Sequence, residues 1–497
     1  MATNPIAYRA AGQNTREAPQ QEGNKERAGE LNNQGSADLA AGKYRAAAQA
    51  YQQAVTLAPS NAEWHYNYSL ALSDLGDRAG QERELKKAVL LNPSLLPALD
   101  DLGLCYLNDG KLREAEEQFK DALRINPRFA GAQNDLGILY AREGKTSEAA
   151  AMFQQATTND PHYVQAFMNW GIALASAGNY FQASALFEKA IQISPKLANA
   201  YIALAECTVK EGHKQEAIPI FQKALKLQPA SPSVHVNLGI ALADTGRYNE
   251  ALAQFREAVR LDANDAAAYY NEARVLSTFN RIDLARRDLE TACKLDPRYS
   301  DAIYLLALIE RRSNHLRRST DLLQKVAALS PHDSNAQYEL GRNLQQMGRP
   351  QEAIEHWRLS LKADPDNTKA LYSLAQALGK TDSQEARVYM DRFQALQKQQ
   401  ILTDRIRTLG NFGLQAADEH RWNRAVSDFE QAIALCGNCL QGERLHKDFG
   451  LILARKGDSA RARRELETSL KLNPHDDEAL KALEVLDARQ TQPVNTN

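Results

Sequence analysis

Four tyrosines recur in this chain at one constant interval, and arginines stand among them. The tyrosines are Tyr270, Tyr304, Tyr338 and Tyr372, and the arginines are Arg274, Arg311, Arg312 and Arg342. Tyrosine rings stack on apolar groups and cations, and guanidinium groups bind carboxylates through paired hydrogen bonds. The set therefore indicates a surface for polypeptide segments with apolar and acidic side chains. The alternative is that the arginines pair with nearby Glu310 and Glu339.

Asparagines follow the same interval at a neighbouring position of the repeated unit. They are Asn33, Asn67, Asn169, Asn237, Asn271 and Asn411. An amide donates to a peptide carbonyl and accepts from a peptide N–H, so a row of amides can hold a backbone without reading its sequence. Each asparagine can equally bond within its own repeat, and the sequence leaves both alternatives open.

Aspartates replace asparagine at this position in two units. They are Asp101 and Asp135, and Asp100 stands directly before the first. A carboxylate only accepts hydrogen bonds, so we expect this stretch to favour a ligand with donors or positive charge. The candidate groove is therefore expected to be acidic near the third and fourth repeats and basic and aromatic near the eighth to eleventh.

One repeated element must position all of these side chains. Prolines close the units at Pro59, Pro93, Pro127, Pro161, Pro195, Pro229, Pro297, Pro331 and Pro365. Turn glycines keep the same step at Gly42, Gly76, Gly110, Gly144, Gly178, Gly212, Gly246 and Gly348, and Asn280 and Asn314 replace the glycine twice. Both residue types tolerate a left-handed backbone, and proline ends the preceding helix. Each unit is therefore predicted to be a helical hairpin, and hairpins of this kind must stack on their neighbours.

Within a unit, small and aromatic residues keep constant positions. If Pro232 is position 1, Gly239 is position 8, Ala251 is position 20, Phe255 is position 24 and Ala258 is position 27. Small residues let two helices approach closely, and the aromatic ring fills the space beside them. On the first helix (helix A), positions 4, 7, 8 and 11 pack inward, which leaves positions 2, 5, 6, 9, 12 and 13 for a ligand.

These positions, together with the closing proline, resemble the tetratricopeptide repeat (TPR) family. The resemblance covers roughly residues 28 to 476, and the array looks similar to that of O-GlcNAc transferase without its catalytic domain. It implies an all-α solenoid, a right-handed superhelix of about thirteen helical hairpins with a C-terminal capping helix. It further implies that helix A lines a concave wall that holds an extended peptide or a partner helix.

The repeat pattern predicts six segments along the chain. Residues 1–27 are expected to form a disordered tail, because they contain few apolar residues. The other segments are ten regular repeats (28–367), a degenerate repeat with a long second helix (368–405), two further repeats (406–476), a capping helix (477–489) and a second disordered tail (490–497).

Composition excludes several classes of function. The net charge of −2 argues against binding nucleic acid by general electrostatic attraction. The chain has no long apolar run, hence no expected membrane span. It shows no signal peptide and no cysteine before Cys105, so we expect a cytoplasmic protein. A wrongly chosen start codon would leave export open.

The cysteines and histidines indicate no cofactor and no metal site. Cys436 and Cys439 form the one C-x-x-C pair, and His446 supplies at best one of the two further ligands that zinc needs. We expect the two cysteines to be incidental and reduced, and a disulfide is the alternative if the protein is exported.

The sequence therefore predicts a non-enzymatic scaffold that binds other proteins or peptides in the groove of its array. One alternative is a regulatory or substrate-recruiting subunit for a separately encoded enzyme. A second is an envelope or pilus assembly factor, which requires export.

Overall fold

The computed structural model describes residues 17–379, 381–437, 439 and 441–490, and within them the chain forms 26 helices and no strands. Odd-numbered helices up to α21 are helix A of a repeat: α1 (Glu17–Ala40), α3 (Ala62–Asp74), α5 (Leu96–Asn108), α7 (Ala130–Arg142), α9 (Val164–Ser176), α11 (Ala198–Lys210), α13 (Pro232–Asp244), α15 (Ala266–Thr278), α17 (Ser300–Arg312), α19 (Ser334–Gln346) and α21 (Thr368–Leu378). Even-numbered helices up to α20 are helix B: α2 (Tyr44–Leu57), α4 (Arg78–Leu91), α6 (Leu112–Ile125), α8 (Thr146–Asn159), α10 (Tyr180–Ile193), α12 (Lys214–Leu227), α14 (Tyr248–Leu261), α16 (Ile282–Leu295), α18 (Leu316–Leu329) and α20 (Pro350–Ala363). The remaining helices are α22 (Ser383–Asp418), α23 (Trp422–Cys436), α24 (Gly442–Lys456), α25 (Ser459–Leu472) and α26 (Asp477–Gln490).

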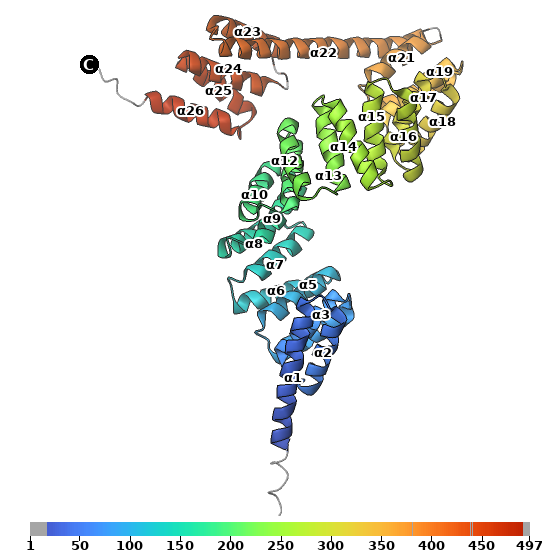
Figure 1. Cartoon of the computed structure of the whole chain (residues 1–497). Coiled ribbons are helices and arrows are strands. Elements are labelled where there is room, and N and C mark those ends of the chain that lie inside the picture. The colour runs from blue at the N-terminus through green and yellow to red at the C-terminus, as the bar shows by residue number, and fades with distance from the viewer. Residues whose placement is uncertain (1–16, 380, 438, 440, 491–497) are drawn as a thin grey trace, which may run out of the picture. The chain divides into compact units, whose positions relative to one another are not determined.

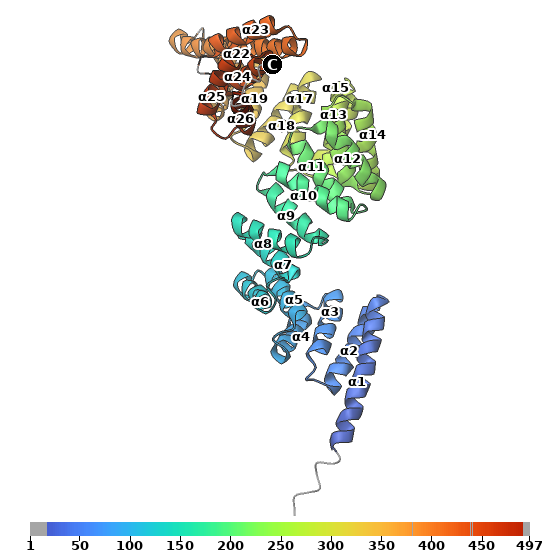
Figure 2. The same cartoon turned by 90° about the vertical axis from the view of Figure 1, so that its left-hand side faces the viewer.

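The helices group into two compact units, residues 1–288 (unit 1) and 289–497 (unit 2). Within each unit every helix folds back along the one before it, so that the repeats are stacked hairpins (Figure 1, Figure 2). The fold is the all-α repeat solenoid that the periodic prolines and glycines predict.

Backbone freedom and close packing explain the turn and core residues. Gly42 and its equivalents have positive φ, and Asn280 and Asn314 adopt the same conformation with φ of 57° and 63°. At position 8, a Cβ on Gly103 would lie 2.5 Å from the ring of Phe119, which is fully buried. The glycine therefore makes room for the aromatic ring that helix B inserts against helix A.

In four of the described repeats a polar pair joins position 4 of helix A to position 23 of helix B, and we call this pair the A–B clip. The pairs are His65–Glu84 (2.6 Å), His235–Gln254 (2.7 Å), Gln337–His356 (2.8 Å) and His446–Glu465 (2.6 Å). The other ring nitrogen of His65 lies 3.0 Å from the carbonyl oxygen of Pro59, and that of His235 lies 3.1 Å from the Pro229 carbonyl. Position 4, expected only to pack inward, thus also ties the loop between repeats to the hairpin.

Two expected boundaries differ from the structure. Residues 17–27, expected to be disordered, belong to α1, because their Glu, Gln, Lys, Arg and Ala residues are good helix formers that extend the first helix A. Residues 1–16 and 491–497 lie outside the described residues. Near residue 405 the helix does not end, since α22 serves as helix B of the degenerate repeat and continues as helix A of the next.

Cys436 and Cys439 are joined by a disulfide, with Cα atoms 5.0 Å apart, which corrects our expectation that they are reduced. Helix α23 ends at Cys436, and Gly437 follows with φ of 53°, so the chain turns back sharply enough to bring the cysteines together. In the described part of the chain, no helix has the length and apolar character that a membrane crossing requires.

Candidate functional site

The candidate site is the face of helix A formed by positions 2, 5, 6, 9, 12 and 13, which we call the helix A wall. Because the repeat is regular, each of these positions recurs on successive helices and forms a file along a unit. The sequence-predicted residues occupy these files, but their partners and burial differ from repeat to repeat.

The asparagine file links neighbouring repeats of unit 1. Asn67 donates to Asn32 Oδ1 at 3.0 Å, Asn169 donates to Asn134 Oδ1 at 3.0 Å, and Asn237 donates to Glu206 Oε1 at 2.9 Å. Each acceptor belongs to the preceding repeat. Bonding within the same repeat occurs at Asn271, which donates to the Ala267 carbonyl, and at Asn169, whose Oδ1 also accepts from Gln165 at 3.0 Å. Asn33 is exposed. An amide keeps one further N–H and spare acceptor capacity after such a bond.

Three carboxyl groups meet on the wall of unit 1. Asp100 and Asp101 lie on α5, and Asp135 lies on α7. Burial, followed by Asp135 and Asp101, raises the pKa of Asp100 to about 8. Burial also raises the pKa of Asp135 to about 6, although Asn134 donates to its Oδ1 at 2.7 Å. Asp100 is therefore mostly protonated at neutral pH, unlike the fully charged carboxylate that the sequence suggested.

Two tyrosines that sequence reasoning missed complete this acidic cluster. Tyr66 on α3 lies close to Asp101, and burial, followed by the charge of Asp101, raises the pKa of the Tyr66 hydroxyl strongly. Tyr163, which precedes α9, has its pKa raised to about 12 by burial and by Asp135 and Asp100. Tyr66 stands at position 5 of its repeat, so its place in a wall file was visible in the sequence.

Position 9 of the unit 1 wall carries apolar residues that sequence reasoning also missed. Leu104, Ile138 and Ile240 are half-buried there, and Ile172 is 50% exposed. The signal was present in the sequence, because branched apolar residues recur at this position with the period of the repeat. Next to the acidic cluster, the wall therefore offers apolar side chains.

The wall of unit 2 places two guanidinium groups on one carboxylate. Arg311, on α17, forms an ion pair with Glu339 on α19. Arg342 Nη1 lies 3.4 Å from the same carboxylate, and its guanidinium carbon lies 6.0 Å from the centre of the Tyr338 ring. Burial and the neighbouring Arg342 lower the pKa of Arg311. Glu310, the other expected partner, instead contacts Arg318 and His315.

The tyrosine file is not uniform. Tyr338 is buried and packs in the core of unit 2 beside Trp357, whereas Tyr304 is half-buried, and burial raises its pKa. Tyr372 is 42% exposed, with its ring centre 5.2 Å from that of Phe393. Tyr270 and Arg274 belong to unit 1, where Arg274 lies 3.4 Å from Asp244. Arg312 is an exposed residue at the end of α17. In unit 2, Tyr304 and Tyr372 thus remain the accessible members.

Solved structures that match the chain include repeat proteins of several kinds. The APC/C hetero-tetramer Cut9–Hcn1 is 16% identical over 93% of this chain and 96% of that chain, with a TM-score of 0.39. YrrB, described as a TPR protein with an unusual peptide-binding site, is 24% identical over 38% of this chain and 96% of that chain, with a TM-score of 0.34. PilF of Pseudomonas aeruginosa is 22% identical over 42% of this chain and 94% of that chain, with a TM-score of 0.38.

Comparison with curated proteins found no match. Family models described as tetratricopeptide repeat match residues 32–93, 106–170, 163–230, 202–266, 270–334 and 334–367. These stretches together cover more than half of the chain, and they coincide with the stacked hairpins of the structure. The chain therefore belongs to the tetratricopeptide repeat family.

Proposed function

We propose that this chain is a non-catalytic protein-interaction scaffold that binds segments of partner proteins on its helix A wall. The wall of unit 1 takes a segment that carries basic and apolar side chains. The wall of unit 2 takes a segment that carries a carboxylate beside an apolar or aromatic group. A chain built of tetratricopeptide repeats is typical of such scaffolds.

The acidic cluster of unit 1 is the observation that carries this proposal. Asp100, Asp101 and Asp135 come from adjacent repeats, and no ion pair with them occurs in the described part of the chain. Asp100 Oδ1 is buried and has no hydrogen-bond partner. A buried acceptor without a partner is costly, and a ligand's ammonium or guanidinium group would supply both the donor and the charge.

The other residues of the helix A wall indicate which further side chains the bound partner segment carries. In unit 1, the exposed Ile172 and its equivalents at position 9 support binding of apolar side chains next to a basic one. In unit 2, Arg311 and Arg342 share Glu339, which leaves one positive charge in excess. A ligand carboxylate can bind this excess charge, with Tyr304 and Tyr372 beside it for apolar contact.

A charge-matched comparison tests the proposal in unit 1. The probe is a fluorescein-labelled peptide of alternating lysine and isoleucine or leucine, and its affinity is measured by fluorescence anisotropy. We expect the variant with Asp100, Asp101 and Asp135 changed to Asn to bind at least about tenfold more weakly, because charge-assisted hydrogen bonds contribute about 1.5–3 kcal/mol. The control changes Glu114, Glu117 and Glu148, which are exposed on helix B, to Gln. Equal losses in both variants would show only non-specific attraction.

Proton release provides a second readout of the same site. A bound cation lowers the pKa of Asp100 from about 8, so at pH 7 the carboxyl group loses its proton when the probe binds. Calorimetry in phosphate and in Tris should therefore give binding enthalpies that differ by the number of protons released, about one, times the difference between the ionisation enthalpies of the two buffers. Identical enthalpies in the two buffers would place the probe away from Asp100.

A further inference from the structure

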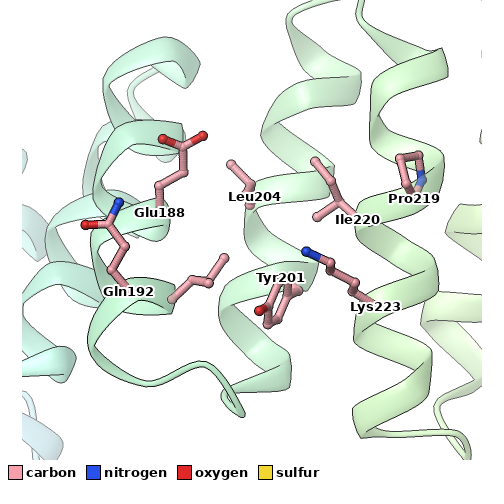
Figure 3. Close-up of a pocket in the computed structure, with 8 residues that line it drawn as sticks. Glu188, Gln192, Tyr201, Leu204, Pro219, Ile220 and Lys223 are labelled. Atoms are coloured by element: carbon pink, nitrogen blue, oxygen red, sulfur yellow. The ribbon is translucent and has the colours of Figure 1, made fainter.

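A groove opens in unit 1 between two B helices, α10 and α12, above the helix A that separates them, α11 (Figure 3). Its volume is about 360 Å³, and its apolar lining includes Ile191, Leu204, Pro219 and Ile220. Glu188 stands on the α10 side and Lys223 on the α12 side (Figure 3). A groove of this volume can hold a few side chains of a ligand.

The A–B clip is replaced in the repeat that carries this groove. Tyr201 and Ile220 occupy the two clip positions, which hold His and Glu, or His and Gln, in the four clipped repeats. The Tyr201 hydroxyl donates to the Pro195 carbonyl at 3.3 Å, so it keeps the loop contact of position 4. Ile220 makes no polar bond, and its side chain is left half-buried on the groove. An apolar opening thus replaces a closed polar contact.

This groove is separate from the helix A wall. Its floor residues on α11, Tyr201 and Leu204, stand at positions 4 and 7, whereas Ile202 and Glu206 of the same helix stand at wall positions 5 and 9. On a helix with about 100° per residue, the two pairs point to opposite sides. A partner in the groove would therefore leave the wall accessible.

The exposed apolar surface continues beyond the groove along α10. Phe181 is 79% exposed and stands seven residues before Glu188, hence on the same face of the helix. The equivalent residues of the two adjacent repeats are Ser147 and Gln215, which are polar. From Phe181 to Gln192 this face is about 16 Å long, which accommodates about three turns of a further helix.

We propose that this groove binds an amphipathic helix of a partner protein, with a basic residue facing Glu188 and an acidic residue facing Lys223. The groove is bounded by helices, whose backbone groups are bonded internally except at Pro219, which has no N–H to donate to the Gln215 carbonyl. Its occupant must therefore satisfy its own backbone hydrogen bonds, as a helix does and an extended segment does not. The opposite charges of Glu188 and Lys223 determine which flank of the bound helix lies against α10 and which against α12.

A pair of designed peptides tests the proposal. The probe is a fluorescein-labelled helical peptide with leucines at i, i+3, i+4 and i+7, lysines along one flank and glutamates along the other. The second peptide has the same composition with the flanks exchanged. We expect the peptide with matched flanks to bind at least fivefold more tightly by fluorescence anisotropy. Ile220→Glu should weaken it at least tenfold, whereas Leu90→Glu, at a site 81% exposed on α4, should not.

Crosslinking locates the bound peptide without disturbing the groove. A photoreactive phenylalanine analogue at position 181 should crosslink to the matched peptide in protein with unchanged helix content by circular dichroism. The proposal is wrong if both peptides bind equally, if Ile220→Glu binds as the wild type does, or if Asp100→Asn with Asp135→Asn removes binding instead. Self-association that Ile220→Glu abolishes, measured by light scattering, would assign the groove to a second copy and also overturn it.

Discussion

The helix A walls of the two units carry excess charge of opposite sign, and the free-energy cost of burying that charge is reduced in a different way in each unit. In unit 1 the buried carboxyl of Asp100 keeps its proton, because its pKa is raised to about 8. In unit 2 the guanidinium groups of Arg311 and Arg342 cannot lose a proton under ordinary conditions, so Glu339 supplies the counter-charge. An acid can thus be neutralised by pH alone, whereas an arginine needs a partner.

This difference implies different couplings for ligand binding. A cation that binds the acidic cluster releases a proton, so its affinity rises with pH through the range in which Asp100 titrates. A carboxylate that binds Arg311 and Arg342 must compete with Glu339, so its affinity depends on how tightly that residue is held. The mutations below separate the two mechanisms, beginning with the largest expected effect.

Removing the counter-charge in unit 2 should have the largest effect. Glu339 is 7% exposed, and Glu339→Gln leaves two guanidinium groups side by side without a carboxylate. We expect a loss of about 3 kcal/mol in the local stability of α17 and α19, as is typical when one partner of a buried ion pair is removed. Hydrogen exchange of peptides from 300–346 measures it.

Glu352→Gln is the matched control, because Glu352 pairs with Arg349 on the surface, where the two side chains are 48% and 44% exposed. This change should leave the stability of α19 and α20 almost unaltered, because exposed ion pairs contribute little. Similar protection from hydrogen exchange in Glu339→Gln and Glu352→Gln would contradict the view that Glu339 stabilises the arginine pair.

In unit 1, removing a buried ionisable group should change stability in the opposite direction. Asp100→Asn eliminates a buried carboxyl whose pKa is raised in the folded protein from 3.8 to about 8. Such a group contributes stability that is complete below about pH 4 and is lost as the pH rises to about 8. We therefore expect Asp100→Asn to stabilise α5 and α7 at pH 8 and to have little effect on them at pH 4. Hydrogen exchange of peptides from 96–142 at the two pH values measures it.

A paired carboxylate in the same unit supplies the reverse pH dependence. Burial opposes ionisation of Glu84, but hydrogen bonds from His65, Lys87 and Arg83 lower its pKa from 4.5 to about 2. This stability is complete above about pH 4.5 and is lost as the pH falls toward 2. We expect α3 and α4 to lose about 1.5 kcal/mol between pH 4.5 and pH 3. Glu84→Gln should remove this loss of stability at low pH and leave the pH dependence that Asp100 causes unchanged. Hydrogen exchange of peptides from α3 and α4 measures the first effect.

The fold follows closely from the sequence because its determinants are local. A turn at Gly42 needs positive φ, and Gly103 must be small because Phe119 packs on it, whatever the rest of the chain does. The end of the array was less predictable, since no proline interrupts α22 between residues 383 and 418, and the helix continues past the expected boundary and through Gly410 and Gly413.

The candidate site was less predictable, because burial and partners depend on neighbouring repeats. The constant interval placed Tyr338 and Tyr372 in one file, yet the first is buried beside Trp357 and the second is exposed. Likewise, nothing in the identity of Asp100 shows that its carboxyl is desolvated by α7, since that contact joins residues of two repeats. The repeat position predicts which way a side chain points, and packing between neighbouring repeats decides whether a ligand can reach it.

The smallest expected effect concerns the neutral part of the wall. Asn169 donates to Asn134, which in turn donates to Asp135, so this amide chain ties α9 to the acidic cluster on α7. Asn169→Ala should lower the stability of α7 and α9 by about 1 kcal/mol, the contribution of one hydrogen bond. It should also raise the pKa of Asp135, because Asn134 is then held less firmly as a donor. Asn33→Ala, at an exposed position of the same file, is the control. Nuclear magnetic resonance titration of the Asp135 carboxyl carbon that showed no difference between these variants would mean that the asparagine file joins repeats without tuning their charge.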